Sequence, residues 1–258
     1  MAEAKQEYQY AGRETAREEA FESIWTNDLE EVFADVAEYY DRANYVASFG
    51  TFNRIKSSFV ATCDLQPGMK VLDVCAGTNA VGIALLKEQP GLEIQAIDRS
   101  ARMLEVGAEM ASAEGFQIES LKGDVHRMPF PDNHFDIATI QYASRHLRLI
   151  DVFSEIKRVL KPGGHFYHCD MLRPQSKLVE ELYYIYLRSS LTVTAWLFDS
   201  GQSALGCRQY FIDAIKRFYS ADEMSQLMRE VGFRPVVSQS VMMGMIAFHK
   251  AMKPLDGG

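Results

Sequence analysis

The chain has 258 residues, of which 47% are hydrophobic and 24% charged, and its formal net charge is −8. This length and composition suffice for one globular domain with a full core and an additional terminal segment. The negative charge argues against nucleic acid as a main partner, because phosphate binding needs clustered Lys and Arg. The sequence has no run of about 20 uncharged apolar residues, so no membrane span is expected.

The N-terminal residues are expected to form a helical extension, 1–45, that covers a cleft in the remaining domain, 46–258. From Glu14 to Tyr40, apolar residues recur at helical spacing. Ahead of them the chain is polar and charged, without the apolar run of a secretory signal. We therefore expect a cytoplasmic protein, at most loosely associated with the inner face of a membrane.

Strand and helix patterns alternate through the middle of the chain. Strands are expected at 70–75, 93–98, 117–122, 135–141 and 164–169, and helices at 80–88, 100–114 and 149–160. This alternation predicts a mostly parallel sheet with helices on both faces. Pro162-Gly163-Gly164 is expected to stop the third helix, at Leu160, and turn the chain into the next strand.

After Asp170 the pattern becomes helical. The segment 175–218 is expected to form a helical cap on the acceptor side of the site, with ordinary packing helices as the alternative. An amphipathic helix, Ala221 to Val231, has Ser220 as its candidate N-cap. The segments 234–240 and 241–250 are expected to close the sheet as an antiparallel pair.

The stretch from Lys70 to Leu86, KVLDVCAGTNAVGIALL, predicts a buried strand, a tight turn and a helix. This arrangement presents backbone N–H groups and a helix N-terminus to a nucleotide-like ligand. Asp98 ends the next apolar run, where a carboxylate can accept hydrogen bonds from ribose hydroxyls. Because the turn has a single glycine, Gly77, it fits a dinucleotide poorly, and another adenosine-containing cofactor is expected.

Further motifs follow in a fixed order, and together they resemble the class I S-adenosylmethionine-dependent methyltransferases. The closer resemblance is to the ubiquinone/menaquinone biosynthesis C-methyltransferases, from about Tyr40 to Lys253. It rests on Tyr40-Asp41-Arg42-Ala43-Asn44, the turn after the first strand, PFPDNHFD (129–136), Arg145, LKPGG (160–164) and GMIAFHK (244–250). The resemblance implies a Rossmann-like α/β fold with a seven-stranded, mostly parallel sheet, and S-adenosylmethionine as the cofactor.

The resemblance also implies a set of cofactor-binding residues. They are Asp73, Ala76, Gly77, Thr78, Asn79, Asp98, Arg99, Asp124, Val125 and Gln141. The chain departs from the family at Asn79-Ala80, where Gly-Asp is usual. Asn tolerates a positive φ better than other non-glycine residues, so the turn can survive. The missing carboxylate leaves Asp73 to hold the cofactor ammonium alone, or weakens binding.

For the acceptor, the resemblance implies Arg145, His146 and Asp170 as catalytic residues and Tyr40, Asn44 and Tyr210 as substrate-binding residues. A permanent guanidinium cation near a quinol hydroxyl favours the phenolate. The structural alternative is that Arg145 only pairs with Asp170 or Asp136 and holds a loop. His146 stands where the family has Asn, so it is either a base or a hydrogen-bonding substitute.

The expected activity is C-methylation of a prenylated quinol, with demethylmenaquinol as the leading acceptor and S-adenosylhomocysteine as the product. Two alternatives stay open: another aromatic or small lipophilic acceptor, and a non-catalytic accessory protein that binds S-adenosylmethionine. Peripheral membrane contact and a homodimer are further open possibilities. We expect no metal site, because the histidines lack metal-ligand spacing.

Several side chains have a structural interpretation that is the more common one. His249 is expected to be a buried, hydrogen-bonded strand residue, and Cys75 a small packing residue at the end of a strand. The methionines at 242, 243 and 245 are expected to fill core, with a lipophilic groove as the alternative. Cys63, Cys75, Cys169 and Cys207 form no CxxC pair and are expected to be reduced thiols.

Overall fold

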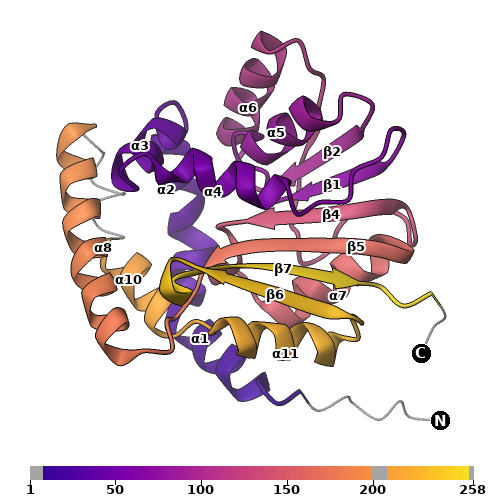
Figure 1. The fold of residues 1–258 in the computed structure, drawn as a ribbon. Coiled ribbons are helices and arrows are strands. Elements are labelled where there is room, and N and C mark those ends of the chain that lie inside the picture. The colour runs from indigo at the N-terminus through magenta and orange to yellow at the C-terminus, as the bar shows by residue number, and fades with distance from the viewer. Residues whose placement is uncertain (1–7, 199–207, 256–258) are drawn as a thin grey trace.

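The computed structural model describes residues 8–198 and 208–255, and a seven-stranded sheet lies at its centre (Figure 1). The strand order is β3-β2-β1-β4-β5-β7-β6. The pairings of β7 with β5 and β6 are antiparallel, and the others are parallel. This confirms the predicted fold class. The strands are β1 (Lys70–Val74), β2 (Glu93–Asp98), β3 (Glu119–Lys122), β4 (Phe135–Gln141), β5 (Leu160–Met171), β6 (Val236–Val241) and β7 (Ile246–Met252).

Helices cover both faces of this sheet. Among the helices that pack on it, α4 (Thr51–Val60) and α5 (Ala80–Glu88) lie on one face, and α7 (Leu149–Val159) and α11 (Ala221–Val231) lie on the other. Alternate residues of β1 serve the two faces, since Val71 packs with Phe59 and Leu85 while Leu72 packs with Phe153 and Leu227. The other helices among the described residues are α1 (Ala11–Ser23), α2 (Leu29–Val36), α3 (Tyr40–Ala47), α6 (Ala101–Ala113), α8 (Lys177–Leu197) and α10 (Arg208–Lys216), with a π-helix η1 (Ile24–Asp28) and 3₁₀ turns η2 (Ser144–His146) and η3 (Met242–Gly244).

The C-terminal elements follow the predictions with two differences. Ser220 caps α11 in a capping box with Glu223, as expected. Helix α7 ends at Val159, and Leu160 already pairs with Phe135, so the Pro-Gly-Gly turn is an irregularity inside β5 rather than a stop before it. The last strand begins only at Ile246, because η3 makes the turn between β6 and β7.

Part of the expected helical cap, 199–207 with Cys207, lies outside the described residues, as do residues 1–7 of the N-terminal extension. In the part of the chain that is described, no helix combines the length and apolar character needed to cross a membrane.

The carboxyl ends of the parallel strands position the site. Strand β1 pairs with β2 on one side and β4 on the other, so the chain changes direction across the sheet at this point. Open α/β sheets bind ligands at such a switch point. Helices α2, α3, α8 and α10 gather beyond that edge of the sheet (Figure 1).

Candidate active site

The turn after β1 combines unusual backbone conformations with a close helix contact. Cys75, Gly77 and Asn79 have positive φ values of 55°, 53° and 56°. Asn79 thus takes the conformation expected of it. A Cβ on Gly107 of α6 would lie 2.7 Å from the Thr78 carbonyl carbon, so only glycine lets α6 approach the turn this closely. Asp98 fixes the turn by accepting from the backbone N–H of Gly77 at 2.9 Å.

A cavity of about 340 Å³ lies beside this turn. Every predicted cofactor residue except Asn79 lines it: Asp73, Ala76, Gly77, Thr78, Asp98, Arg99, Asp124, Val125 and Gln141. Asn79 is buried behind the turn, where its Nδ2 donates to the Ser120 hydroxyl at 3.1 Å. Its contribution is the backbone geometry of the turn. We call this space the cofactor cavity.

Asp73 is a buried carboxylate with one unused oxygen. Its Oδ1 accepts from the Thr139 hydroxyl at 2.7 Å, while Oδ2 has no hydrogen-bond partner among the described residues. Burial raises the Asp73 pKa from 3.8 to about 7. A buried anionic oxygen without a donor fits the ammonium group of a bound amino acid moiety. Burial also raises the pKa of the Cys75 thiol well above its usual value, which disfavours the thiolate and any nucleophilic role.

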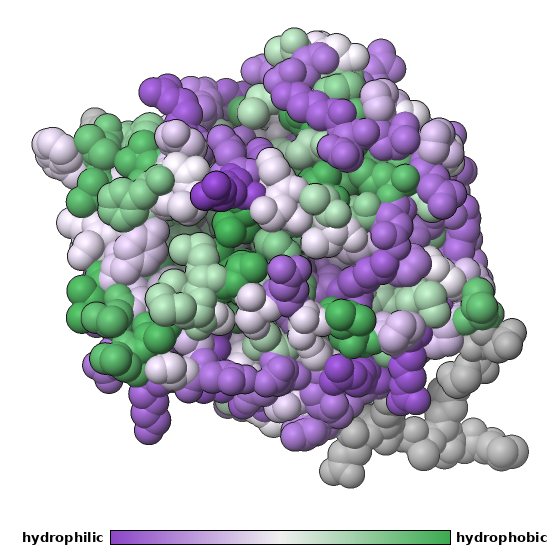
Figure 2. All heavy atoms as spheres, viewed as in Figure 1, coloured by the Kyte–Doolittle hydropathy of each residue, from purple (hydrophilic) through white to green (hydrophobic). Residues whose placement is uncertain are grey.

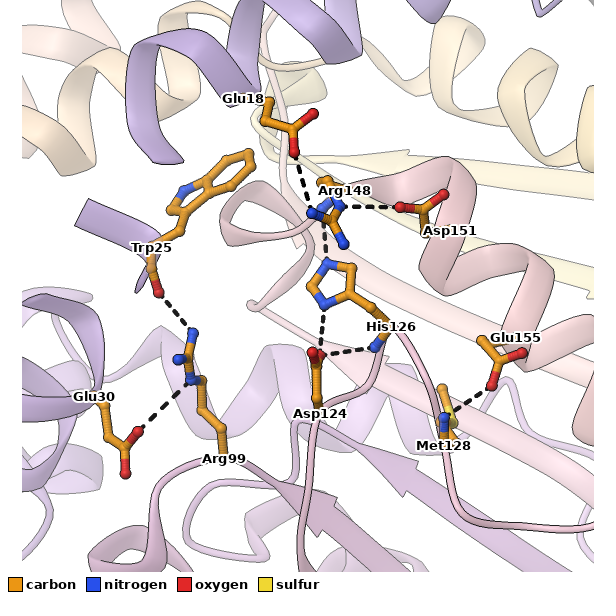
Figure 3. A network of polar contacts seen from close by, with 10 residues as sticks. All are labelled: Glu18, Trp25, Glu30, Arg99, Asp124, His126, Met128, Arg148, Asp151 and Glu155. Atoms are coloured by element: carbon orange, nitrogen blue, oxygen red, sulfur yellow. Dashed lines mark hydrogen bonds and ion pairs between the residues drawn. The ribbon is translucent and has the colours of Figure 1, made fainter. Parts of the chain in front are cut away.

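The N-terminal helices are tied across the cofactor cavity by polar contacts (Figure 3). Arg99, after β2, donates to the Trp25 carbonyl oxygen at 2.6 Å and lies 3.8 Å from the Glu30 carboxylate. Arg148 donates to Glu18 at 3.1 Å. Trp25, Leu29 and Phe33 of the N-terminal segment line the cavity. These contacts could not be predicted from local pattern, because their partners are far apart along the chain.

His126 is held between two groups in the same network (Figure 3). Its Nδ1 lies 2.6 Å from Asp124 Oδ1, and its Nε2 accepts from the Arg148 backbone N–H at 3.2 Å. Since Nε2 is an acceptor here, the ring proton lies on Nδ1 and is shared with Asp124. The contact orients Asp124 at the rim of the cofactor cavity.

A second cavity, of about 720 Å³, lies between α3, α8 and the turn η3. Its lining is mostly apolar and includes Tyr40 and Asn44, the two predicted substrate-binding residues of α3. Three buried polar atoms in this lining have no hydrogen-bond partner within the described chain: Arg145 Nε, Asn44 Nδ2 and Tyr183 Oη. Such atoms in an apolar cavity fit an aromatic ligand with oxygen substituents. We call this space the acceptor cavity.

Arg145 lines the acceptor cavity and also forms the ion pair with Asp170 that its structural interpretation expects. Its Nη1 donates to Asp170 Oδ1 at 2.8 Å and to the Tyr142 carbonyl oxygen at 2.7 Å. Although burial disfavours the charge, the adjacent Asp170 carboxylate raises the Arg145 pKa. The guanidinium therefore stays cationic in the wall of the acceptor cavity. Asp136, the other partner considered, instead accepts from Lys161 at 2.6 Å.

Asp170 and Tyr210 line neither of the two cavities within the described ranges. Asp170 is fully buried and also accepts from the Ser144 N–H at 2.8 Å, so it holds the loop that carries Arg145. Tyr210 was expected in the acceptor pocket, but its hydroxyl lies behind His146, 2.5 Å from Nδ1, and accepts from the Trp25 indole at 2.8 Å. The helical spacing of α10 could not reveal which face meets the site.

His146 lines the cofactor cavity with an unpartnered Nε2. Burial, with the Arg145 and Arg17 charges, lowers the His146 pKa well below 6.5. The ring is therefore neutral at pH 7 and a weak base. These surroundings favour the hydrogen-bonding interpretation of His146 over the general-base one.

The two cavities meet at four shared residues, Phe33, Tyr40, Phe52 and Tyr142. Tyr142 has a positive φ of 58°, which is strained for an aromatic residue, and its ring stacks on Phe52 with centroids 5.7 Å apart. Asp41 lies beside Tyr40 in the cofactor cavity, with burial raising its pKa and its Oδ1 unpartnered in the described structure. Sequence analysis overlooked Tyr142, Tyr183 and Asp41 as site residues.

Two buried histidines beneath the site are structural. His249 places its Nε2 3.0 Å from the Ala221 carbonyl oxygen and its Nδ1 3.1 Å from His168. Burial lowers the His249 pKa to about 4. The hydrogen-bonded strand interpretation of His249 is confirmed.

Comparison with known proteins agrees with this geometry. The model of the ubiE/COQ5 methyltransferase family matches residues 21–253. The chain belongs to this family. A demethylmenaquinone methyltransferase of Symbiobacterium thermophilum is 31% identical over 89% of this chain and 94% of its own length. A ubiquinone/menaquinone biosynthesis C-methyltransferase UbiE of Burkholderia multivorans is 32% identical, over 86% and 90%.

Solved structures share the fold at lower identity. A phosphoethanolamine N-methyltransferase 2 of Haemonchus contortus, in complex with S-adenosyl-L-methionine, aligns with a TM-score of 0.58 at 16% identity, over 80% of this chain and 53% of that one. A SAM-dependent methyltransferase of Aquifex aeolicus aligns with a TM-score of 0.53 at 22% identity, over 78% and 88%. This chain is thus an S-adenosylmethionine-dependent methyltransferase by family, with the corresponding fold.

Proposed function

We propose that this enzyme methylates a ring carbon of a prenylated quinol, with demethylmenaquinol as the leading acceptor. The observation that carries the proposal is the acceptor cavity, which is apolar apart from Arg145, Asn44, Tyr183 and a few other polar groups, and which meets the cofactor cavity at Tyr40 and Phe52. A quinol head needs a few polar contacts, and a prenyl tail needs apolar surface. The names of the two relatives support the same acceptor class.

We assign the cofactor-binding roles from the lining of the cofactor cavity. Asp98 accepts hydrogen bonds from the ribose hydroxyls, and Oδ2 of Asp73 accepts from the ammonium group. Asp124 and Val125 border the adenine, and Gln141 lies near the methionine moiety. Arg99 holds the covering helices closed over the cofactor. When bound, S-adenosylmethionine supplies a methyl group on a sulfonium, whose sulfur leaves with the bonding electron pair.

Arg145 is assigned the activation of the acceptor. Its cation stabilises the phenolate of the quinol, which raises electron density on the adjacent ring carbon. That carbon forms the new C–C bond as the S–C bond breaks, and the ring then loses its proton. We assign this proton to Asp41, because it lines the cofactor cavity beside Tyr40, where the two cavities meet, and its Oδ1 is unpartnered within the described chain; its raised pKa also suits proton acceptance. Asp170 positions Arg145, and His146 offers a hydrogen bond to the cofactor.

Calorimetric titration with S-adenosylmethionine, followed by methyl incorporation into a panel of quinols, tests this proposal. We expect saturable binding and turnover of prenylated naphthoquinols. Asp98→Ala should weaken cofactor binding at least tenfold, because it removes charge-assisted hydrogen bonds of about 1.5–3 kcal/mol each. Binding without any turnover would instead identify an accessory protein, and turnover of unprenylated phenols alone would identify a different acceptor.

The cellular setting follows from the acceptor. A prenylated quinol resides in the bilayer, so we propose that the enzyme works on the cytoplasmic side of a membrane as a peripheral protein. Exposed apolar surface could instead form a homodimer interface. The experiments below distinguish membrane contact from dimerisation.

A further inference from the structure

Helix α8 carries a stripe of exposed apolar side chains along its outer face. Leu178, Leu182, Ile185, Val193 and Trp196 are 71%, 58%, 63%, 51% and 80% exposed. Their spacing of three, four or eight residues keeps them on one face of the helix. In the space-filling view, apolar side chains gather along the left edge, over α8 (Figure 2).

The opposite face of α8 is apolar as well. Tyr183 and Leu187 are 4% and 7% exposed, pack with Ile212 and Ile215 of α10, and line the acceptor cavity. A soluble surface helix normally pairs an apolar inner face with a polar outer face. In α8 both faces are apolar, so the outer face is suited to contact with something other than water.

The opening of the acceptor cavity lies within the same exposed apolar region. Leu178, Leu182, Phe49, Met242 and Met243 all line the cavity and are also exposed, Phe49 by 84% and Met243 by 73%. The expectation that Met242 and Met243 fill core is therefore wrong, and the lipophilic-groove alternative is supported. We define the docking surface as these five residues together with Ile185, Val193 and Trp196.

We propose that this docking surface rests on a lipid bilayer, with α8 lying along the membrane plane and the acceptor cavity opening into the lipid. The proposal rests on the proposed function, since it supplies the route by which a lipophilic quinol reaches Arg145. A lipid surface is favoured over a second copy of the chain because a protein seated on these residues would cover the opening. Lipid is fluid and itself delivers the acceptor.

The charges of α8 determine how the protein should bind. Lys177 and Arg188 are balanced by Glu180 and Glu181 along the helix. The helix therefore lacks the cationic excess that draws proteins to anionic lipid. Binding should depend on apolar insertion, so it should persist on zwitterionic vesicles and at high salt.

Flotation with phosphatidylcholine vesicles, without acceptor, tests the surface independently of the proposed function. We expect the wild-type protein to float in both low and high salt. The double variant Ile185→Glu, Trp196→Glu changes residues that line neither cavity, and its vesicle partitioning should fall at least tenfold. The matched control, Met110→Glu with Val237→Glu, changes exposed apolar residues of α6 and β6 and should float like wild type.

A native reporter gives a second readout. Of the two tryptophans, Trp196 is 80% exposed and Trp25 is 8% exposed. Lipids brominated on their acyl chains should quench wild-type fluorescence and should not quench a Trp196→Phe variant. Methylation of a long-chain quinol in vesicles should fall in the double variant, while methylation of a short-chain quinol in solution stays within about twofold.

Three outcomes would overturn the proposal. Wild-type protein that fails to float on any vesicle would remove the lipid contact, even if quinol methylation is intact. Equal flotation of the double variant would place the contact elsewhere. A wild-type dimer in sedimentation that the double variant converts to monomer, without vesicle binding, would assign the surface to a second copy of the chain.

Discussion

Arg145 pairs with Asp170 through Nη1, while its Nε has no partner within the described chain and can donate to the acceptor. If it stabilises a phenolate, its benefit is realised mainly in the transition state. Arg145→Met should then lower kcat and kcat/KM together, by about 10²–10³-fold, with little change in cofactor affinity. Arg145→Lys should recover only part of the rate, because an ammonium keeps the charge without the planar fork. Steady-state kinetics with calorimetry on each variant provides the measurement.

The purely structural interpretation of Arg145 makes the opposite prediction. Loss of the pair with Asp170 would lower the melting temperature, and the protein that stays folded would turn over normally. A stable Arg145→Met variant with wild-type kcat would exclude Arg145 from acceptor activation.

Asp73 predicts a pH dependence of cofactor binding. Its ionised form is needed to hold an ammonium group, and its pKa is about 7 before the cofactor binds. Affinity for S-adenosylmethionine should therefore rise from pH 6 to pH 8 by about tenfold, the size set by one pH unit below the pKa. Calorimetry in buffers of different ionisation enthalpy should detect proton release at pH 6. Asp73→Asn should bind more weakly, with a flat profile.

Ionisation of Asp73, which favours cofactor binding, lowers the stability of the cofactor-free enzyme. Because its folded pKa of about 7 lies above the ordinary value of 3.8, its stabilising contribution is complete below pH 3.8 and is lost as the pH rises to 7. The cofactor-free enzyme should thus gain stability from Asp73→Asn at pH 8 but not at pH 4, as followed by urea unfolding. Equal effects at both pH values would show that Asp73 is ionised at no cost.

At the scale of elements, α1 is fastened to the loop that carries Arg145 and His146. The fully buried Arg17 guanidinium donates to the carbonyl oxygens of Arg145 and Leu147 at 3.0 and 3.2 Å and pairs with Glu14. Glu14 in turn accepts from the Leu149 N–H at 2.6 Å. The N-terminal extension therefore completes the hydrogen bonding of the active-site loop.

Arg17→Met should release this attachment. It leaves the Glu14 carboxylate buried and unpaired, and breaking such a pair costs about 3–5 kcal/mol unless α1 undocks first. We expect faster proteolysis within α1 and a lower kcat, both partly restored by adding Glu14→Gln. Arg13→Met, which breaks a more exposed pair with Glu223, is the matched control and should cost about 1 kcal/mol or less. Arg17→Met with normal kcat and proteolysis would limit the pair to a local role within α1.

Over the whole molecule, the sequence predicted what depends on local pattern. The alternation of strand and helix patterns predicted the sheet, and the identity of Asn79 as an asparagine predicted its positive φ. The positive φ of Tyr142 was not foreseen, because no residue preference marks it and contacts with Phe52 and Cys169 impose it. The π-helix at Trp25 and the roles of Arg17 and Tyr183 likewise depend on partners distant in sequence.

Within the described chain, the linings of the two cavities have only Phe33, Tyr40, Phe52 and Tyr142 in common, and they include different exposed residues. Glu22 and Thr26 border the cofactor cavity, and Phe49 and Met243 border the acceptor cavity. Neither ligand therefore has to pass through the site of the other.

We accordingly expect cofactor and acceptor to bind in either order. An unreactive quinol analogue should bind the cofactor-free enzyme in calorimetry and should inhibit noncompetitively with respect to S-adenosylmethionine. Prior binding of S-adenosylhomocysteine should change the affinity for the analogue by no more than about fivefold, the lower end of typical coupling between sites. Uncompetitive inhibition, with no binding to the cofactor-free enzyme, would mean that cofactor binding forms the acceptor cavity. In that case the covering helices would have to close over the cofactor before the quinol could bind.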